Sequence, residues 1–223
     1  MQADPPHQPD FDRVARIYRW AEYASLGPLL ERTREHFLPR LTGCRRALLL
    51  GDGDGRFLAR LLQQNRGLQA VAVDTSAKML HLLATRCHRA KSNATTRLRT
   101  HHGSALHVTP AKDTDLIVSH FFFDCFAQSE VDALTHRLAA QVAPGTLWLV
   151  SDFGVPRPRA LRPLAALYIH ALYLAFRVLT GLRTARLPDP QAALTRAGFE
   201  RIARHEVLLG LLYTELWRRC QSI

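Results

Sequence analysis

The sequence predicts an α/β protein with a doubly wound, mostly parallel seven-stranded sheet and an antiparallel C-terminal hairpin strand. N-terminal helices precede the sheet, and a helical insertion precedes its sixth strand. Two observations predict this fold. Short apolar runs alternate with amphipathic runs between residues 47 and 150, a pattern typical of strands joined by crossover helices. Two extended runs near the C-terminus are then separated only by a tight connection, which requires an antiparallel pair.

The 223 residues are expected to form one domain with four segments. These are an N-terminal helical lid (1–43), a ligand-binding core (44–155), an apolar helical insertion (156–188), and a C-terminal helix with a β-hairpin (189–223). In the lid, apolar residues recur at helical spacing over residues 11–26 and 28–41, and Gly27-Pro28 separates the two helices.

The core alternates strands and helices in order. We expect strands over residues 47–50, 68–73, 97–101, 116–118 and 147–150. Helices are expected over 57–64 and 76–91, and a third begins at Ser129 with Asp132 three residues later, which resembles a capping box. Because parallel strands end at one edge of a sheet, a ligand is expected at their carboxyl ends.

The C-terminal segment breaks this rhythm. Asp189 and Pro190 are expected to begin a short helix that Gly198 ends. The extended runs 202–209 and 211–217 follow, with only Gly210 between them. No crossover helix fits in that space, so the two runs are predicted to be antiparallel neighbours.

The insertion is almost wholly apolar over residues 161–182, a length that suits a helix of about five to six turns. Its uncharged part, between Arg162 and Arg177, is shorter than the roughly 17 to 25 residues that a bilayer span needs. We therefore expect it to cap the sheet or a substrate pocket. The alternative is a helix lying on a membrane surface, which would give the protein a peripheral membrane contact.

The charge and cysteine content restrict partners and compartment. The net charge is +11, and residues 156–223 hold eleven arginines against four acids. This bias fits a nucleic acid, an anionic lipid or an acidic substrate as partner, but it also fits solvated protein surfaces, because no long basic run occurs.

Four scattered cysteines without a CxxC pair, and no signal-peptide pattern, predict reduced thiols in the cytoplasm. His101 and His102 would point opposite ways in a strand, so no metal site is expected.

A glycine-rich loop, Gly51-Asp52-Gly53-Asp54-Gly55, directly follows the first expected strand and opens a helix. Glycines there allow the backbone to approach a ligand closely. The spacing is GxGxG, unlike the GxGxxG of NAD-type domains, because Arg56 occupies the last position. The two aspartates would repel a pyrophosphate, so the loop favours a cationic ligand.

Asp74 ends the second expected strand about 20 residues after the loop, where a carboxylate can bind ribose hydroxyls. The alternative is that Asp74, Thr75 or Ser76 simply caps the following helix.

Four stretches resemble motifs of class I S-adenosylmethionine-dependent methyltransferases. They are ALLLGDGDGRF (47–57), VAVDTSAKML (71–80), DLIVSHFFFDCF (115–126) and APGTLWLVSDF (143–153), so the resemblance covers about residues 45–155. The stretches FDRVARIYRW (11–20) and LPDPQAALTRAGF (187–199) are similar to the branch that methylates ubiquinone and menaquinone precursors.

The resemblance implies S-adenosyl-L-methionine as cofactor, whose sulfonium and ammonium suit the acidic loop. It implies that Tyr18 belongs to a lid over the cofactor and that the loop Gly51, Asp52, Gly53, Asp54 and Gly55 holds it. Asp74, with Thr75 beside it, would bind the ribose, and Met79, Gly103, Ser104 and Ala105 would lie at the adenine. His120 and Phe121 would face the methyl group that is transferred. Two family acids are absent, since Leu49 and Ser104 occupy their positions. Our hypothesis is that Asp52 or Asp54 replaces the acid missing at Leu49.

Methyl transfer depends mainly on positioning, and it needs a base only when the acceptor loses a proton. His120 and Asp124 are the candidate catalytic bases, although a histidine at this place could equally be structural. Phe121, Phe122 and Phe123 with the apolar insertion favour a small, apolar acceptor, although three phenylalanines also occur in ordinary cores.

Two other functions remain open. The residues Ser119-His120-Phe121-Phe122 lack the (N/D)PP(Y/F) motif of amino-methylating nucleic-acid enzymes, and Cys125 is not in a Pro-Cys pair. The arginines nevertheless leave an RNA-directed methyltransferase as an alternative. A non-catalytic binding or scaffold protein with this fold would explain the altered motifs. The oligomeric state is not predicted.

Overall fold

The computed structural model describes residues 26–90, 94–154, 156, 158 and 188–221. Nearly all of the expected helix over 11–26, Tyr18 included, and the whole apolar run 161–182 lie outside these residues. Among the helices that the structure describes, none is long and apolar enough to cross a membrane.

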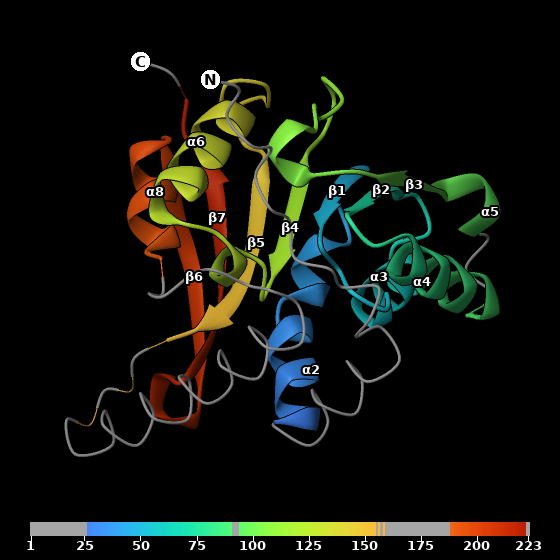
Figure 1. The fold of residues 1–223 in the computed structure, drawn as a ribbon, viewed down its shortest axis with the longest axis horizontal. Helices are drawn as coiled ribbons and strands as arrows, with labels where there is room; N and C mark the ends of the chain where they lie inside the picture. Colours follow the sequence, from blue (N-terminus) through green and yellow to red (C-terminus); the bar gives the residue numbers. More distant parts are fainter. Residues whose placement is uncertain (1–25, 91–93, 155, 157, 159–187, 222–223) are drawn as a thin grey trace, which may run out of the picture.

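Seven strands form one sheet in the order β3-β2-β1-β4-β5-β7-β6 (Figure 1). Their bounds are β1 (Arg46–Leu50), β2 (Gln69–Asp74), β3 (Leu98–His102), β4 (Leu116–His120), β5 (Leu147–Phe153), β6 (Phe199–Val207) and β7 (Leu212–Arg219). Neighbours among β1 to β5 pair in parallel, whereas β7 is antiparallel to both β5 and β6. The predicted fold class is therefore confirmed, including the C-terminal hairpin.

The predicted helices that the structure describes occur in the predicted order, and α5 (Ala94–Arg97) and several 3-10 helices are added to them. They are α2 (Gly27–Glu35), α3 (Arg56–Gln64), α4 (Ala77–Arg89), α5 (Ala94–Arg97), α6 (Gln128–Ala139) and α8 (Pro190–Arg196), with short 3-10 helices η1 (Leu38–Leu41), η2 (Ala105–His107), η3 (Phe123–Cys125) and η5 (Leu208–Gly210). The helix expected over 28–41 is interrupted after Glu35. Pro39 explains the break, because it has no N–H to donate to the Glu35 carbonyl and its ring would clash there.

The start of α6 also differs from the prediction. Ser129 lies inside the helix, which begins at Gln128, and Glu130 rather than Asp132 supplies the capping carboxylate. The Glu130 Oε2 atom accepts a hydrogen bond from the Ala127 N–H at 2.8 Å. At α8 the prediction is confirmed, since Asp189 Oδ1 accepts from the Ala192 N–H at 2.9 Å.

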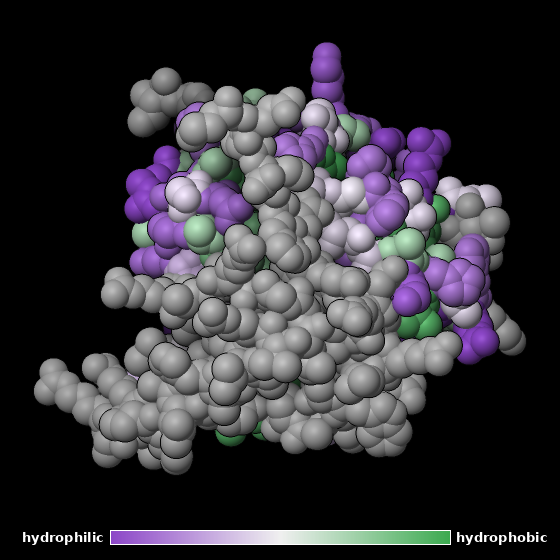
Figure 2. Space-filling model, in the orientation of Figure 1, coloured by the Kyte–Doolittle hydropathy of each residue, from purple (hydrophilic) through white to green (hydrophobic). Residues whose placement is uncertain are grey.

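Alternate residues of each strand face opposite sides of the sheet, and each side has its own apolar core. On one side Leu49 packs with Phe57 and Leu83 from α3 and α4. On the other side Trp148 packs with Leu134 and Leu194 from α6 and α8. The outer surfaces over α6 and α8 are largely hydrophilic, as expected for amphipathic helices (Figure 2). The sheet is thus covered on both faces, and its carboxyl edge is where a site can form.

Candidate functional site

The glycine loop lies at the carboxyl edge between β1 and α3, in a backbone conformation that requires glycine. Gly51, Gly53 and Gly55 have φ angles of +62°, +60° and +78°. A Cβ at Gly51 would lie 2.8 Å from Phe122 Cδ2, and one at Gly55 would lie 2.7 Å from Leu83 Cγ. The loop is therefore packed too closely for any side chain at these two positions.

Asp54 binds its own neighbours. Its Oδ1 atom lies 3.0 Å from Arg56 Nε and its Oδ2 atom 2.8 Å from Arg86 Nη2. Arg86 Nε also donates to the Asp54 carbonyl at 2.9 Å. Asp54 is buried, and its charge is compensated by two arginines. Two aspartates could replace the missing acid. Asp54 is already paired with arginines and links the loop to α4, which leaves Asp52 as the candidate.

Asp52 has a different environment. Its Oδ2 atom accepts a hydrogen bond from the Leu58 N–H at 3.2 Å, in the first turn of α3. Burial raises the pKa of Asp52 to about 7, and the positive charge of Arg34 opposes that rise. The residue is half-buried, and the guanidinium of Arg34 acts on it electrostatically. A cationic ligand group that binds beside Asp52 would favour loss of the carboxyl proton and would then interact with the Asp52 carboxylate.

Arg34, near the end of α2, faces the same edge of the sheet. Its charge acts on Asp52 and on His120, lowering the pKa of both, and its Cζ atom lies 5.0 Å from the centroid of the Phe121 ring. Sequence analysis did not identify Arg34, because α2 carries other arginines and only the folded chain brings one of them to the loop.

Asp74 ends β2, one strand away from the loop, since Val73 pairs with Leu50 of β1. Its Oδ1 atom accepts from the Ser76 N–H at 2.8 Å. Ser76 is the N-cap of α4, because its Oγ atom accepts from the Met79 N–H at 3.1 Å. The capping role therefore belongs to Ser76, and Asp74 is a half-buried carboxylate at the sheet edge. The Thr75 carbonyl lies 2.9 Å from His102 Nε2.

The predicted adenine side follows β3. The Gly103 N–H donates to the Asp74 carbonyl at 2.9 Å, and Ser104 Oγ accepts from the Leu106 N–H at 3.2 Å. Gly103 and Ser104 are half-buried, whereas Met79 and Ala105 are only 3% and 6% exposed and belong to the core. Of these residues, the edge therefore offers mainly Gly103 and Ser104 to a ligand.

His120 ends β4 and is 3% exposed. Its Nδ1 atom lies 2.9 Å from Ser151 Oγ, and its ring meets that of Phe57 edge-on at 4.4 Å. Burial, with a smaller effect of Arg34, holds the pKa of His120 well below its usual value. The ring is therefore neutral near pH 7. Phe121, which follows, has a φ of +49°, and its ring lies 5.1 Å from that of Phe153.

Two further carboxyl groups lie at the carboxyl edge of the sheet, one in η3 after β4 and one near the end of β5. Burial raises the pKa of Asp124, in η3, to about 6, and Cys125 Sγ lies 3.5 Å from its Oδ1 atom. Asp152 is 3% exposed, and burial together with the charge of Asp124 raises its pKa well above the usual value. Sequence analysis missed Asp152. The available signal was an acid near the end of an otherwise apolar strand.

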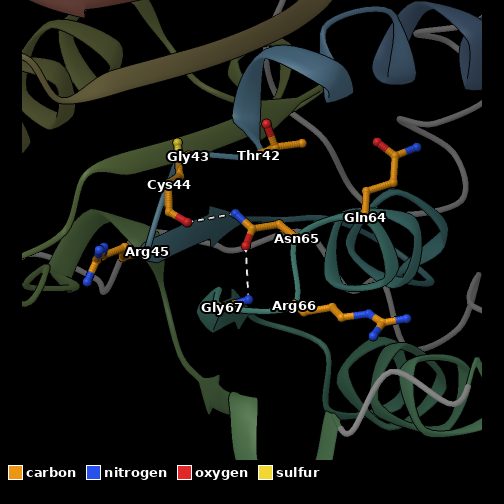
Figure 3. A pocket seen from close by; sticks show the side chains of 8 residues that line it. All are labelled: Thr42, Gly43, Cys44, Arg45, Gln64, Asn65, Arg66 and Gly67. Carbon is orange, nitrogen blue, oxygen red and sulfur yellow. Dashed lines mark hydrogen bonds between the residues drawn. The ribbon is translucent and has the colours of Figure 1, made fainter.

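The described residues contain no group of three or more histidine, cysteine or acidic side chains that could hold a metal ion. A separate pocket of about 590 Å³ lies at the amino end of β1, lined by residues that include Cys44, Asn65 and Gly67 (Figure 3). Asn65 is committed to the backbone there, since its Nδ2 atom donates to the Cys44 carbonyl at 2.6 Å and its Oδ1 atom accepts from the Gly67 N–H at 3.1 Å. This pocket is at the opposite end of the strand from the glycine loop.

The comparisons with known proteins agree on one kind of domain. A family model described as a methyltransferase domain matches residues 48–147, from β1 to the first residue of β5. A search of curated protein sequences finds no match.

Among solved structures, the chain is similar to an O-methyltransferase family protein from Burkholderia thailandensis, with a TM-score of 0.70, 15% identity, and coverage of 97% of this chain and 66% of that one. It is also similar to the N-methyltransferase NodS from Bradyrhizobium japonicum, with a TM-score of 0.60, 14% identity, and coverage of 87% and 98%. For the mitomycin 7-O-methyltransferase MmcR the TM-score is 0.64, the identity 18%, and the coverage 87% and 55%. The chain thus spans less than two thirds of both O-methyltransferase chains, and identities this low show a shared fold.

Proposed function

We propose that this chain, whose core is a methyltransferase domain with the class I fold, transfers a methyl group from S-adenosylmethionine to a small, apolar acceptor. The observation that carries the proposal is that Asp52 of the glycine loop lies within electrostatic reach of the Arg34 guanidinium, whose charge lowers the pKa of Asp52 against the effect of burial. The amino-acid end of S-adenosylmethionine bears an ammonium and a carboxylate, and these two side chains offer one group of opposite charge to each. A pyrophosphate is entirely negative, so Arg34 would attract it but the Asp52 carboxylate would repel it.

The ribose and adenine of S-adenosylmethionine would also have partners at the carboxyl edge of the sheet. Asp74 would take the ribose hydroxyls, with Thr75 beside it, and Gly103 and Ser104 would lie at the adenine. The positive φ angles of Gly51, Gly53 and Gly55 support this fit, because a tight glycine turn lets a backbone approach a ligand without an intervening side chain. Tyr18 as a lid residue, and the four-segment domain organisation, stay predictions.

Bound S-adenosylmethionine supplies a methyl group already activated by its sulfonium. The protein then has to hold the acceptor in line and exclude water. Phe121 and Phe153 are half-buried and in contact at the carboxyl ends of β4 and β5, so they offer an apolar wall for the acceptor.

A hydroxyl acceptor must also lose a proton, and Asp124 suits that role better than His120. A general base works best when its pKa lies near the working pH, and the pKa of Asp124 is about 6. His120 is a much weaker base because its pKa lies well below the usual value. Asp152 adds a second carboxyl group that interacts electrically with Asp124 and would help it to hold the proton.

The charge distribution does not favour RNA as acceptor. The arginines that the structure describes after residue 187 are engaged within the chain. Arg196, Arg201, Arg204 and Arg218 form ion pairs with acidic side chains, and Arg219 donates to backbone carbonyls. Phosphate contacts would have to compete with these partners. The nearer resemblance to quinone-precursor methyltransferases depends partly on residues 11–20 and stays a prediction.

The experiment has two steps. S-adenosylmethionine should raise the thermal unfolding midpoint, and NAD should not. Methyl-labelled S-adenosylmethionine is then incubated with the protein and a panel of phenols, amines and thiols, with RNA as a further arm. Label in a small phenol fits the full proposal. Label only in RNA would redirect the proposal to nucleic acid, and stabilisation without any labelled product would favour a binding or scaffold role.

A further inference from the structure

The two ring nitrogens of His120 differ in their partners. Its Nδ1 atom is hydrogen-bonded to Ser151, but its Nε2 atom is buried and has no hydrogen-bond partner among the residues that the structure describes. A buried polar atom without a partner costs free energy, and in native structures such atoms often mark a place where a ligand supplies the missing group.

The partners of Nδ1 determine what Nε2 can bind. Ser151 Oγ donates to Thr214 Oγ1 at 2.9 Å, so its hydroxyl hydrogen is already used. With Ser151 as the donor to Thr214, the Ser151 oxygen accepts from His120 and the ring hydrogen is on Nδ1, a tautomer that forms part of the proposal below. The imidazole is neutral, so Nε2 presents a bare lone pair and requires a hydrogen-bond donor. Ser151 and Thr214 are fully buried, which holds this arrangement in place.

The position of His120 points to the donor's ammonium. Ser119 pairs with Leu50, so His120 lies beside Gly51 at the start of the glycine loop. Its side chain is on the same face of the sheet as Leu49, because Leu49 pairs with Val118, two residues before His120. Leu49 occupies the position of an acid in the family that the sequence resembles. Phe57 contacts the His120 ring, and the next residue, Leu58, holds Asp52. His120 and Asp52 therefore both contact the first turn of α3, through neighbouring residues.

We propose that His120 Nε2 accepts a hydrogen bond from the α-ammonium of the methyl donor, and that Ser151 and Thr214 are positioning residues that fix the ring tautomer for this contact. The inference rests on the proposed function. Together with Asp52, a neutral nitrogen acceptor takes over the place of the family acid absent at Leu49. Burial, together with the charge of Arg34, lowers the pKa of His120 and so makes an imidazolium unfavourable there.

The test compares two ligands by calorimetry. S-adenosylhomocysteine carries the ammonium, whereas 5′-methylthioadenosine has the same nucleoside and thioether without the amino-acid end. His120→Asn should weaken S-adenosylhomocysteine binding about tenfold and leave methylthioadenosine affinity within about twofold. His120→Gln places an amide oxygen near the Nε2 position and should recover part of the loss. Ser151→Ala should show a smaller but equally ligand-specific loss.

Ser119→Ala is the matched control. Ser119 Oγ accepts from Trp148 Nε1 at 3.0 Å on the opposite face of the sheet, so this change also removes a buried hydrogen bond from β4. It should leave the ratio of the two affinities unchanged. Nitrogen-15 spectra of the histidines should also show the His120 proton on Nδ1 in the free protein.

The outcomes separate the inference from the proposed function. If the wild-type protein binds neither ligand, the proposed function fails. If it binds both and His120→Asn weakens them equally or not at all, only the assignment of His120 fails. A proton on Nε2 in the free protein would also overturn that assignment.

Discussion

Asp54 and Arg86 are joined across the glycine loop and α4 by an ion pair of 2.8 Å, and this pair separates the roles of the two loop aspartates. Asp54 is held by arginines of its own chain. Asp52, two residues before it, lies near Arg34 with a pKa near neutrality. The ion pairs of Asp54 therefore stabilise the loop, and we propose ligand recognition for Asp52.

The first prediction concerns Asp54. Asp54→Asn should lower the free energy of unfolding by about 2 kcal/mol, between the values for exposed and buried pairs, because Arg86 is 36% exposed while Asp54 is 11% exposed. Urea denaturation measures the change. Asp113→Asn is the control, since the Arg46–Asp113 pair is 37% and 66% exposed and its loss should cost less than about 0.5 kcal/mol. Equal effects of the two substitutions would contradict the assignment.

The second prediction is a pH dependence of donor affinity. An ammonium binds the ionised carboxylate, and the pKa of Asp52 is about 7. The affinity for S-adenosylhomocysteine should therefore fall as the pH drops from about 8 to about 6, by up to about tenfold for each unit below the pKa. In Asp52→Asn the affinity should be lower and nearly flat over the same range. A wild-type profile as flat as that of the variant would rule out Asp52 as the ammonium partner.

The third prediction concerns the loop backbone. Gly55→Ala combines a φ of +78° with a Cβ that would lie 2.7 Å from Leu83 Cγ and 2.8 Å from its Cα. It should cost roughly 3 kcal/mol or more. Gly145→Ala has a similar φ of +87° but nothing within 4 Å, so it isolates backbone strain and should cost about 1 kcal/mol. Chemical denaturation of both variants checks the difference, and similar costs would show that Leu83 moves aside.

The fourth prediction concerns a stacked histidine pair that joins the end of α2 to β6. The rings of His36 and His205 lie 3.7 Å apart and within 6° of parallel. Burial and the neighbouring His205 and Arg40 lower the pKa of His36 below 6.5. Because the folded state favours neutral His36, this stabilisation is present above about pH 6.5 and is lost as the pH falls through the lowered pKa.

Thermal unfolding checks this sign. Between pH 7.5 and pH 5, the wild-type midpoint should fall by about 2 to 4 °C more than that of His205→Phe, which keeps a stacked ring without the second charge. Comparing the two proteins at each pH cancels the contributions of Asp52, Asp124 and Asp152, which titrate in both. Parallel profiles would show that the histidine pair does not couple α2 to β6 electrostatically.

Sequence periodicity predicted the strands along the chain and the antiparallel C-terminal pair, because buried strands and amphipathic helices leave distinct patterns. The helix break at Pro39 and the start of α6 were missed, since both depend on local hydrogen bonds that compete within one or two residues. At the site, glycine spacing and acid positions identified the loop and Asp74. Arg34 and Asp152 were missed, because they reach the site only through packing of distant segments.

The central claim is that the carboxyl edge binds a methyl donor, and calorimetric titration of the wild-type protein with S-adenosylhomocysteine tests it most directly. We predict saturable binding at one site per chain, weakened about tenfold or more in Asp74→Ala through loss of the ribose contact. No measurable heat with S-adenosylhomocysteine or S-adenosylmethionine up to about 1 mM would contradict the claim.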